Sequence, residues 1–295
     1  MIKPVDFGFN AETAVNNTFQ SSENADVAQE NALKEFTDFV SVLTKNGIRV
    51  TVIEDTPVPH TPDSIFPNNW ISFHEDDNII LYPMFAANRR AERKQHVLDA
   101  IKKDFIVKKE IDLTGYEAQH LFLEGTGSMV LDRDQKLSYA CISPRTDEKV
   151  LNEFCRIENY KAITFTAVDA NGIQIYHTNV MMCVGDKFVV ICLESIPNEA
   201  ERKKVITAIE ASGKKIISIS LDQMNSFAGN MLQVVNDKKE KLLIMSTQAF
   251  QSLTANQIAS LEKYNRIVHS SLDTIEKAGG GSARCMMAEI FLDSK

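Results

Sequence analysis

A unit of strand, polar corner, hairpin and helix recurs along this chain about every 50 residues, and such a repeat constrains the fold more than any single motif. A long amphipathic segment, 27–45, precedes the first copy. The corners of the five copies fall at 63–69, 124–127, 177–179, 227–230 and 279–285. Alternating strand and helix patterns of this length predict an α/β fold, and five similar units favour closure into a ring.

Strand and turn signals predict the elements of each copy. Strands are expected at 48–53, 105–111, 216–221, 266–269 and 286–292. Hairpins are expected at 70–73 with 79–82, 128–131 with 137–142, and 231–235 with 242–245. Gly185-Asp186 supplies a tight turn after a strand at 180–184, and a charged helix is expected at 88–102.

Ring closure would bring the five corners to one end of a central axis, as loops converge on one face of other α/β rings. The corner residues that carry chemistry are two carboxylates, an imidazole, two amides and a thiol: Asp63, Glu124, His177, Asn179, Asn230 and Cys285. This combination predicts a catalytic site at that end of the ring.

The five cysteines are scattered, with no CxxC pair and no zinc-like Cys/His spacing, so we expect reduced thiols and no metal site. Four of them lie in apolar or amphipathic stretches, where a free cysteine behaves as a small hydrophobe. Cys285 alone would be interpreted in the same way. The glycine run 279–281 directly before it indicates instead a backbone that bends sharply or approaches a ligand.

Charge and hydropathy exclude several classes of partner. A net charge of −8 without a basic stripe argues against nucleic acid, and no apolar run reaches the ~18 residues that would predict a membrane span. Residues 1–6 contain no signal-like apolar region, so a cytoplasmic protein is expected. Length alone allows one large domain or two smaller ones, and the oligomeric state stays open, a homo-oligomer included.

At these residues the chain resembles the amidinotransferase and arginine deiminase superfamily, the pentein fold, and within it the citrulline-utilisation hydrolases. The resemblance covers essentially the whole chain. Its motifs are Phe7-Gly8-Phe9-Asn10-x-x-Thr13-Ala14, the block 61–70 (TPDSIFPNNW), Leu123-Glu124-Gly125-Thr126-Gly127, His177-Thr178-Asn179 and the glycine run before Cys285. The resemblance implies a single catalytic domain over 1–295, a five-bladed α/β propeller with the active site in its central channel.

The resemblance also implies a role for each site residue. Cys285 is the expected nucleophile, His177 the general acid/base, and Glu124 the carboxylate that holds the histidine or touches the substrate. Asp63 is expected to bind the substrate's NH groups, with Phe66 and Asn69 of the same block also at the substrate. Arg145, and either Arg89 or Arg90, resemble arginines that hold an α-carboxylate, and of these two neighbours Arg90 is the one expected at the substrate.

The chemistry agrees with these roles and needs no cofactor. A guanidino or ureido carbon is a poor electrophile, so a thiolate is a better attacker than a hydroxyl, and an imidazole can protonate the departing nitrogen. Arginine deiminases and glycine amidinotransferases carry an aspartate where this chain has Asn179. An amide can donate to a ureido oxygen and a carboxylate cannot, so Asn179 favours citrulline, giving ornithine, ammonia and carbon dioxide.

Several alternatives stay open at this stage. An arginine deiminase, a dimethylarginine hydrolase or an amidinotransferase could use the same scaffold, and a non-catalytic binding module is the alternative from another class. Asp63 and Glu124 could be turn or cap residues, His177 a structural histidine and Arg145 a surface charge. A lid that controls water is expected, with 10–24 as the candidate segment.

Overall fold

A computed structural model describes residues 1–21 and 27–295 of the chain. Four sheets in this part have three strands each and share one topology. The first strand pairs antiparallel with the second, and the second pairs parallel with the third after a helical connection. The expected hairpins are therefore confirmed, and the fold is mixed α/β with small sheets.

Three of these sheets have one regular connecting helix. In the first, α3 (Gln95–Asp104) connects the hairpin of β3 (Ile71–Phe73) and β4 (Asn78–Leu81) to β5 (Lys109–Asp112). In the second, α5 (Glu148–Glu158) connects the hairpin of β6 (Val130–Asp132) and β7 (Leu137–Cys141) to β8 (Lys161–Phe165). In the third, α7 (Glu199–Ala211) connects the hairpin of β9 (Met182–Val184) and β10 (Phe188–Ile191) to β11 (Lys215–Ser218). The helices begin at side-chain caps where the sequence supplies them: Asp147 accepts from two backbone amides of α5, and Asn198 does so for α7.

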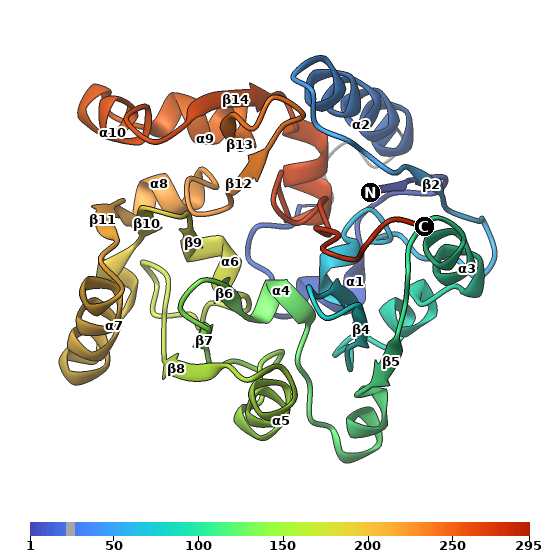
Figure 1. The fold of residues 1–295 in the computed structure, drawn as a ribbon, viewed down its shortest axis with the longest axis horizontal. Helices are drawn as coiled ribbons and strands as arrows, with labels where there is room; N and C mark the ends of the chain where they lie inside the picture. The colour runs from blue at the N-terminus through green and yellow to red at the C-terminus, as the bar shows by residue number, and fades with distance from the viewer. Residues whose placement is uncertain (22–26) are drawn as a thin grey trace.

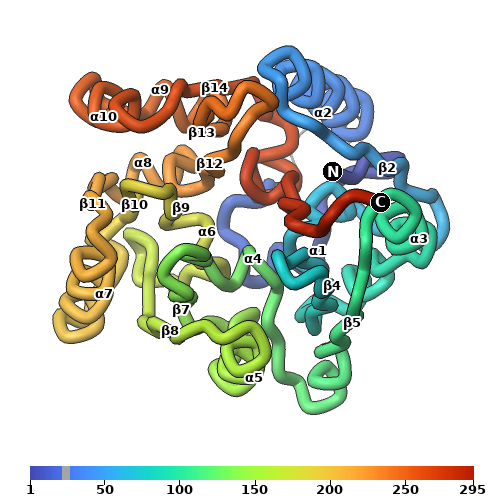
Figure 2. The backbone as a smooth tube through the Cα atoms, in the orientation of Figure 1, coloured from blue at the N-terminus to red at the C-terminus, as the bar shows by residue number. Residues whose placement is uncertain are grey.

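The remaining sheets join the two ends of the chain. One has β12 (Leu232–Val235), β13 (Lys241–Ser246) and β14 (Arg266–Ser270), and the helices α9 (Thr247–Ser252) and α10 (Ala255–Leu261) connect its last two strands. The other pairs β1 (Ile2–Lys3) in parallel with β2 (Ile53–Glu54). Helix α2 (Ala28–Lys45) buries Ala32, Phe36 and Phe39 along one face, and it contacts β14. Figure 2 shows the start and the end of the chain side by side, so the two ends of the chain meet.

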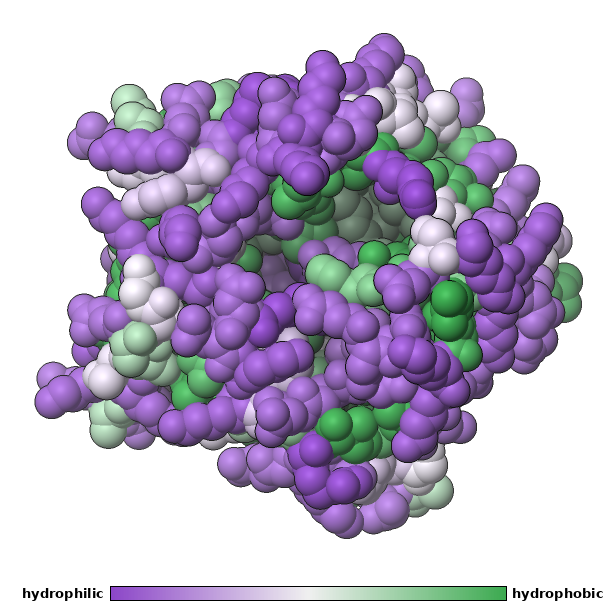
Figure 3. Space-filling view, viewed as in Figure 1, coloured by the Kyte–Doolittle hydropathy of each residue, from purple (hydrophilic) through white to green (hydrophobic). Residues whose placement is uncertain are grey.

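The sheets surround a common centre (Figure 1). Helices α2, α3, α5, α7 and α10 lie at the periphery, whereas the short helices α1 (Ala11–Ala14), α4 (Gly125–Ser128) and α6 (Thr178–Met181) lie nearer the centre. Apolar residues are visible inside a central hollow in the space-filling view, and polar residues dominate the outside (Figure 3). The corners lead directly into β6 and β9, so their residues lie at one end of these central strands and the hairpin turns at the other.

Several expected elements differ in the structure. The strand expected at 48–53 is irregular up to Ile53, and no strand forms at 286–292. The strand expected at 105–111 begins only at Lys109, and the strand expected at 180–184 begins at Met182, because α6 occupies the residues before it. The helix expected at 88–102 is divided into a 3₁₀ helix, Asn88–Glu92, and α3. Buried ion pairs explain the break, since Arg89 pairs with Glu92 and Lys94 with Asp55.

Among the described residues, no helix is both long enough and apolar enough to span a membrane.

Candidate active site

Residues from three corners enclose a small cavity, called here the catalytic cavity. Cys285 and His177 both line it, together with Asp63, Phe66, Asn69, Arg89 and Arg145. Its volume is about 10 Å³, which is the space of roughly one water molecule. The sulfur and the imidazole, 108 positions apart in the sequence (285 minus 177), therefore share one enclosed space, as the ring hypothesis requires.

Two amide groups surround the sulfur of Cys285. Asn230 Nδ2 lies 3.2 Å from Sγ and Asn179 Nδ2 lies 3.4 Å from it. The amide of Asn230 is fixed in orientation, because its oxygen accepts from the backbone N–H of Arg284 and its nitrogen also donates to the carbonyl of Asn179. Hydrogen-bond donors favour the charged form of a group, so this arrangement supports negative charge on the sulfur.

His177 is held by Glu124 in a single orientation. Its Nε2 lies 2.7 Å from Glu124 Oε2, and the other carboxylate oxygen accepts from the backbone N–H of Phe85. A carboxylate accepts, so Nε2 carries the proton of the neutral ring and Nδ1 is left as the acceptor. His177 can therefore take a proton at Nδ1 and later return it.

The charges around this pair keep the imidazole neutral and the carboxylate ionised. Burial lowers the pKa of His177 to about 4; Glu124 opposes the change, while Arg145 and Arg89 add to it. Burial alone would raise the pKa of Glu124, but Arg145, His177 and Arg89 outweigh it, so that pKa lies well below its usual range. A neutral base beside a fixed anion is the state that general base catalysis requires.

Asp63 presents one free oxygen. Its Oδ2 accepts from Asn10 Nδ2 at 2.7 Å and from Thr13 Oγ1 at 3.2 Å, whereas Oδ1 is buried without a protein partner among the described residues. Burial raises the pKa of Asp63, against the lowering effects of Arg89 and Asn10. The free oxygen is available to accept an N–H from a bound substrate.

Asn69 presents a free donor. Arg89 Nη1 donates to Asn69 Oδ1 at 2.9 Å, and because a guanidinium can only donate, the amide oxygen must face Arg89. Nδ2 is consequently turned away and has no protein partner among the described residues. A Cβ on Gly127 would lie 2.4 Å from this Nδ2 and 2.9 Å from His177 Cε1, so glycine is needed where the amide and the imidazole meet.

The N-terminal segment 10–21 covers the cavity. Besides the contacts of Asn10 and Thr13 with Asp63, Asn16 Oδ1 accepts from Arg145 Nε at 2.9 Å, and the N–H of Ser21 donates to the carbonyl of Lys277. Gly280, at φ +63°, leaves room for Asn17, whose Nδ2 would lie 2.5 Å from a Cβ there. Of the lid candidate 10–24, residues 22–24 lie outside the described part of the chain.

Most of the predicted site residues meet, with one exception. Arg90 lies outside the catalytic cavity: its guanidinium donates to the carbonyls of Met84 and Phe85 and lies near Glu117. Choosing Arg90 was therefore wrong, and its neighbour Arg89 is the buried arginine of the cavity, because the 3₁₀ turn directs it inward. The amide nitrogen of Asn179 lies against the sulfur of Cys285, a contact that was not predicted, and its expected place at the substrate stays a prediction.

Asn10, Thr13 and Asn16 are site residues that the sequence interpretation did not assign. The opening motif of the family resemblance contains Asn10 and Thr13, and the lid candidate 10–24 contains all three, but nothing in their spacing indicates contact with Asp63 or Arg145. The described residues contain no group of three or more His, Cys, Asp or Glu side chains that could hold a metal ion.

Solved structures of other proteins share this fold. Among solved structures, the chain is similar to the N-terminal domain of ArgZ covalently bound to a reaction intermediate, with a TM-score of 0.75 and 18% identity over 99% of this chain and 98% of that one. Full-length ArgZ, an arginine dihydrolase from the ornithine-ammonia cycle in cyanobacteria, has a TM-score of 0.77 and 16% identity over 100% of this chain and 42% of its own. A dimethylarginine dimethylaminohydrolase adduct has a TM-score of 0.63 and 15% identity over 88% and 90%.

At these identities the structural likenesses show the fold. A search of curated proteins found no match. The family profile described as "N,N dimethylarginine dimethylhydrolase, eukaryotic" matches residues 3–292. Because that match spans nearly the whole sequence, the chain belongs to this family of hydrolases, within the pentein (amidinotransferase and arginine deiminase) superfamily.

Proposed function

We propose that the protein hydrolyses the ureido group of citrulline to ornithine, ammonia and carbon dioxide through a covalent adduct on Cys285. The proposal includes a single catalytic domain, 1–295, whose five small sheets are the blades of a propeller around the catalytic cavity. The orientation of Asn69 is the observation that carries the choice of substrate.

A ureido group has N–H donors and one carbonyl acceptor, whereas a guanidinium has donors only. The cavity offers an acceptor, Asp63 Oδ1, and a donor, Asn69 Nδ2, neither of which has a partner in the part of the chain that the structure describes. Citrulline can pair with both. A guanidinium would leave the amide of Asn69 buried and unpaired, which costs about 1–3 kcal/mol.

The chemical steps follow from the positions of the side chains. The thiol proton of Cys285 passes to Nδ1 of His177, and the sulfur attacks the ureido carbon. Negative charge grows on the carbonyl oxygen, to which Asn69 Nδ2 donates. His177 returns the proton to the terminal nitrogen, which leaves as ammonia. It then activates the water that cleaves the thiocarbamoyl adduct to the free thiol and a carbamate of ornithine, and this carbamate loses carbon dioxide to give ornithine. In total, citrulline and one water give ornithine, ammonia and carbon dioxide.

Arg145 is the proposed partner of the substrate α-carboxylate. Its guanidinium is buried above the ring of Tyr176 at 4.8 Å, and Asn16 and the carbonyl of Thr13 accept from it in the closed structure. A cavity of about 10 Å³ cannot hold an amino acid, so the segment 10–21 must move for entry. Binding would then exchange the lid oxygens on Arg145 for the carboxylate.

Hydrolysis of arginine or dimethylarginine is the second candidate, favoured by the name of the family profile and by the arginine dihydrolase activity stated for ArgZ. Incubating the pure protein with citrulline, arginine and dimethylarginine in parallel, and measuring ornithine, citrulline and ammonia, separates the candidates. Ornithine from citrulline above a Cys285→Ala control supports the proposal, and turnover of guanidino substrates alone refutes it. Added glycine or lysine would reveal amidino transfer.

A further inference from the structure

A second cavity lies on the other side of Cys285 from the N-terminal segment. It has a volume of about 280 Å³, and its walls are the central strands β6, β9 and β12, the hairpin turns after β6 and β9, and residues of the C-terminal segment. Its wall includes the corner residues Thr126, Asn179 and Arg284 as well as the hairpin turns, so this second cavity runs along β6 and β9 from the corners to the opposite ends of these strands.

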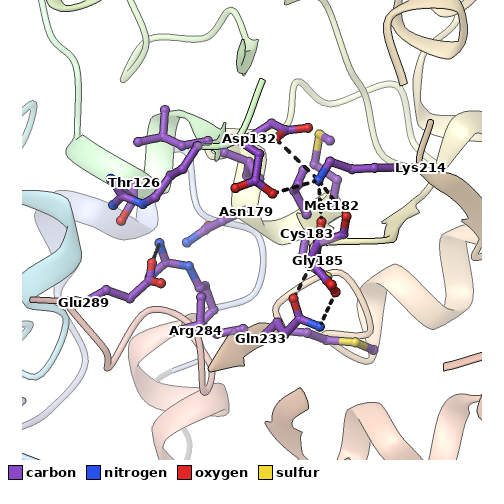
Figure 4. Close-up of a pocket in the computed structure, with 18 of the residues that line it drawn as sticks. Thr126, Asp132, Asn179, Met182, Cys183, Gly185, Lys214, Gln233, Arg284 and Glu289 are labelled. Carbon is purple, nitrogen blue, oxygen red and sulfur yellow. Dashed lines mark hydrogen bonds and ion pairs between the residues drawn. The ribbon is translucent and has the colours of Figure 1, made fainter. Parts of the chain in front are cut away.

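Asn179 and Arg284 connect this cavity with the catalytic centre. Both line the second cavity, where Asn179 lies between Asp132 and Arg284 (Figure 4). The amide nitrogen of Asn179 faces Sγ of Cys285, the residue that follows Arg284. A single side chain, that of Asn179, therefore touches the reacting sulfur and also forms part of the wall of the second cavity.

The second cavity has unpaired acceptors. Asn179 Oδ1 and Asp132 Oδ2 are buried and have no protein donor among the described residues, and both residues are about 1% exposed. Two cations of the wall have partners: Lys214 donates to the carbonyls of Gly185 and Asp186 and lies 3.4 Å from the other oxygen of Asp132, and Arg284 lies 3.5 Å from Glu289. A small donor-rich molecule, such as ammonia or water, matches the two remaining acceptors.

The reaction requires a path by which water reaches Cys285 and ammonia leaves it. The catalytic cavity holds roughly one water molecule while the N-terminal segment is closed, yet each turnover consumes a water and releases ammonia. A substrate whose carboxylate binds Arg145 places its ureido end deepest, next to Cys285. The terminal nitrogen is then the substrate atom nearest to Asn179.

We propose that the second cavity is a binding and exit site for the ammonia formed at Cys285, and the entry for the hydrolytic water, with Asn179 as the gate between the two cavities. The proposal rests on the proposed function for the identity of the product. No bond is made or broken in the second cavity, which passes only neutral ammonia and water while the lid stays closed.

Substitutions that fill the second cavity away from the sulfur test the proposal. Val184 and Leu131 are half-buried residues on two different walls, so Val184→Trp and Leu131→Phe both narrow the second cavity. The control, Ile173→Trp, places a tryptophan at an exposed residue that lines neither cavity. The first measurement is the rate at which methyl methanethiosulfonate labels Cys285 without substrate, followed by mass spectrometry of its peptide. The second is kcat and KM for citrulline.

Both filled variants should slow the labelling and lower kcat by about fivefold or more, with KM unchanged, while Ile173→Trp matches the wild type. Labelling of Cys285 at the wild-type rate in both folded variants would overturn the route, and so would slow labelling with an unchanged kcat. The labelling does not depend on the substrate. Normal labelling of a wild-type protein that does not turn over citrulline would therefore refute the proposed function separately.

Discussion

Replacing Asn69 by aspartate tests the basis of substrate choice, because it exchanges the donor in the cavity for an acceptor at nearly constant shape. One oxygen of the new carboxylate would keep the contact with Arg89 Nη1, now 2.9 Å, so the fold should be retained. The other oxygen would replace Nδ2, which has no protein partner among the described residues and is the proposed donor to the substrate.

The size of the effect follows from the loss of one donor to the developing oxyanion. Loss of such a donor lowers kcat by about 10²–10³-fold, or roughly 3–4 kcal/mol, and the repulsion between two negative oxygens adds to the loss. Citrulline turnover should fall by at least about 10²-fold, whereas arginine turnover should be unchanged or improved, since a second carboxylate suits a guanidinium.

The assay is steady-state ornithine and citrulline formation by Asn69→Asp beside Asn68→Asp, with thermal melting to verify folding. Asn68 is buried one position earlier but does not line the catalytic cavity, so it carries the same chemical change outside the site. Citrulline turnover that survives in Asn69→Asp would refute the reasoning. An equal loss in a folded Asn68→Asp would show that added charge, and not the missing donor, is the cause.

Three further predictions follow from the same geometry. Glu124→Gln should lower kcat by about 10³–10⁴-fold with little change in KM, because the amide no longer fixes the tautomer of His177; a loss below tenfold would contradict the role of Glu124. The acid limb of kcat/KM should fall near pH 4, because the base is active only when neutral and the pKa of His177 is lowered to about 4; a limb near pH 6.5 that persists in NMR titration of His177 would contradict this. Asn16→Ala should lower KM for citrulline several-fold, since it removes a hydrogen-bond partner of Arg145 with which the substrate competes, about 1.5–3 kcal/mol at most. A higher KM would mean that Asn16 binds the substrate.

The repeat made much of the fold predictable, because a run of apolar residues on both sides of a polar turn predicts each hairpin. The pairings of β6 with β7 and of β12 with β13 are confirmed at nearly the expected residues. The irregular stretches at 48–52 and 286–292 could not be predicted, since their apolar patterns are those of strands. Whether such a run becomes a strand depends on a partner from a distant part of the chain, and for the first of these runs that partner, β1, is only two residues long.

Local residue types predicted which side chains line the cavity better than they predicted what each contacts. Cys285, His177 and Asp63 could be proposed because corners at equivalent places in a repeat converge. The choice of Arg90 over Arg89 was wrong because it depends on the rotation of a short 3₁₀ turn, which no local pattern sets. The orientation of the Asn179 side chain could not be predicted either, because its amide contacts the sulfur of Cys285, which is 106 residues away in the sequence.

The central claim is that Cys285 becomes covalently linked to the substrate carbon. Acid quenching during citrulline turnover, followed by mass spectrometry of the peptide that contains Cys285, measures this directly. The account predicts an adduct on this residue that carries the ureido carbon of labelled citrulline and disappears as ornithine accumulates. Turnover of citrulline by Cys285→Ala, or a labelled adduct on any other residue, would contradict it.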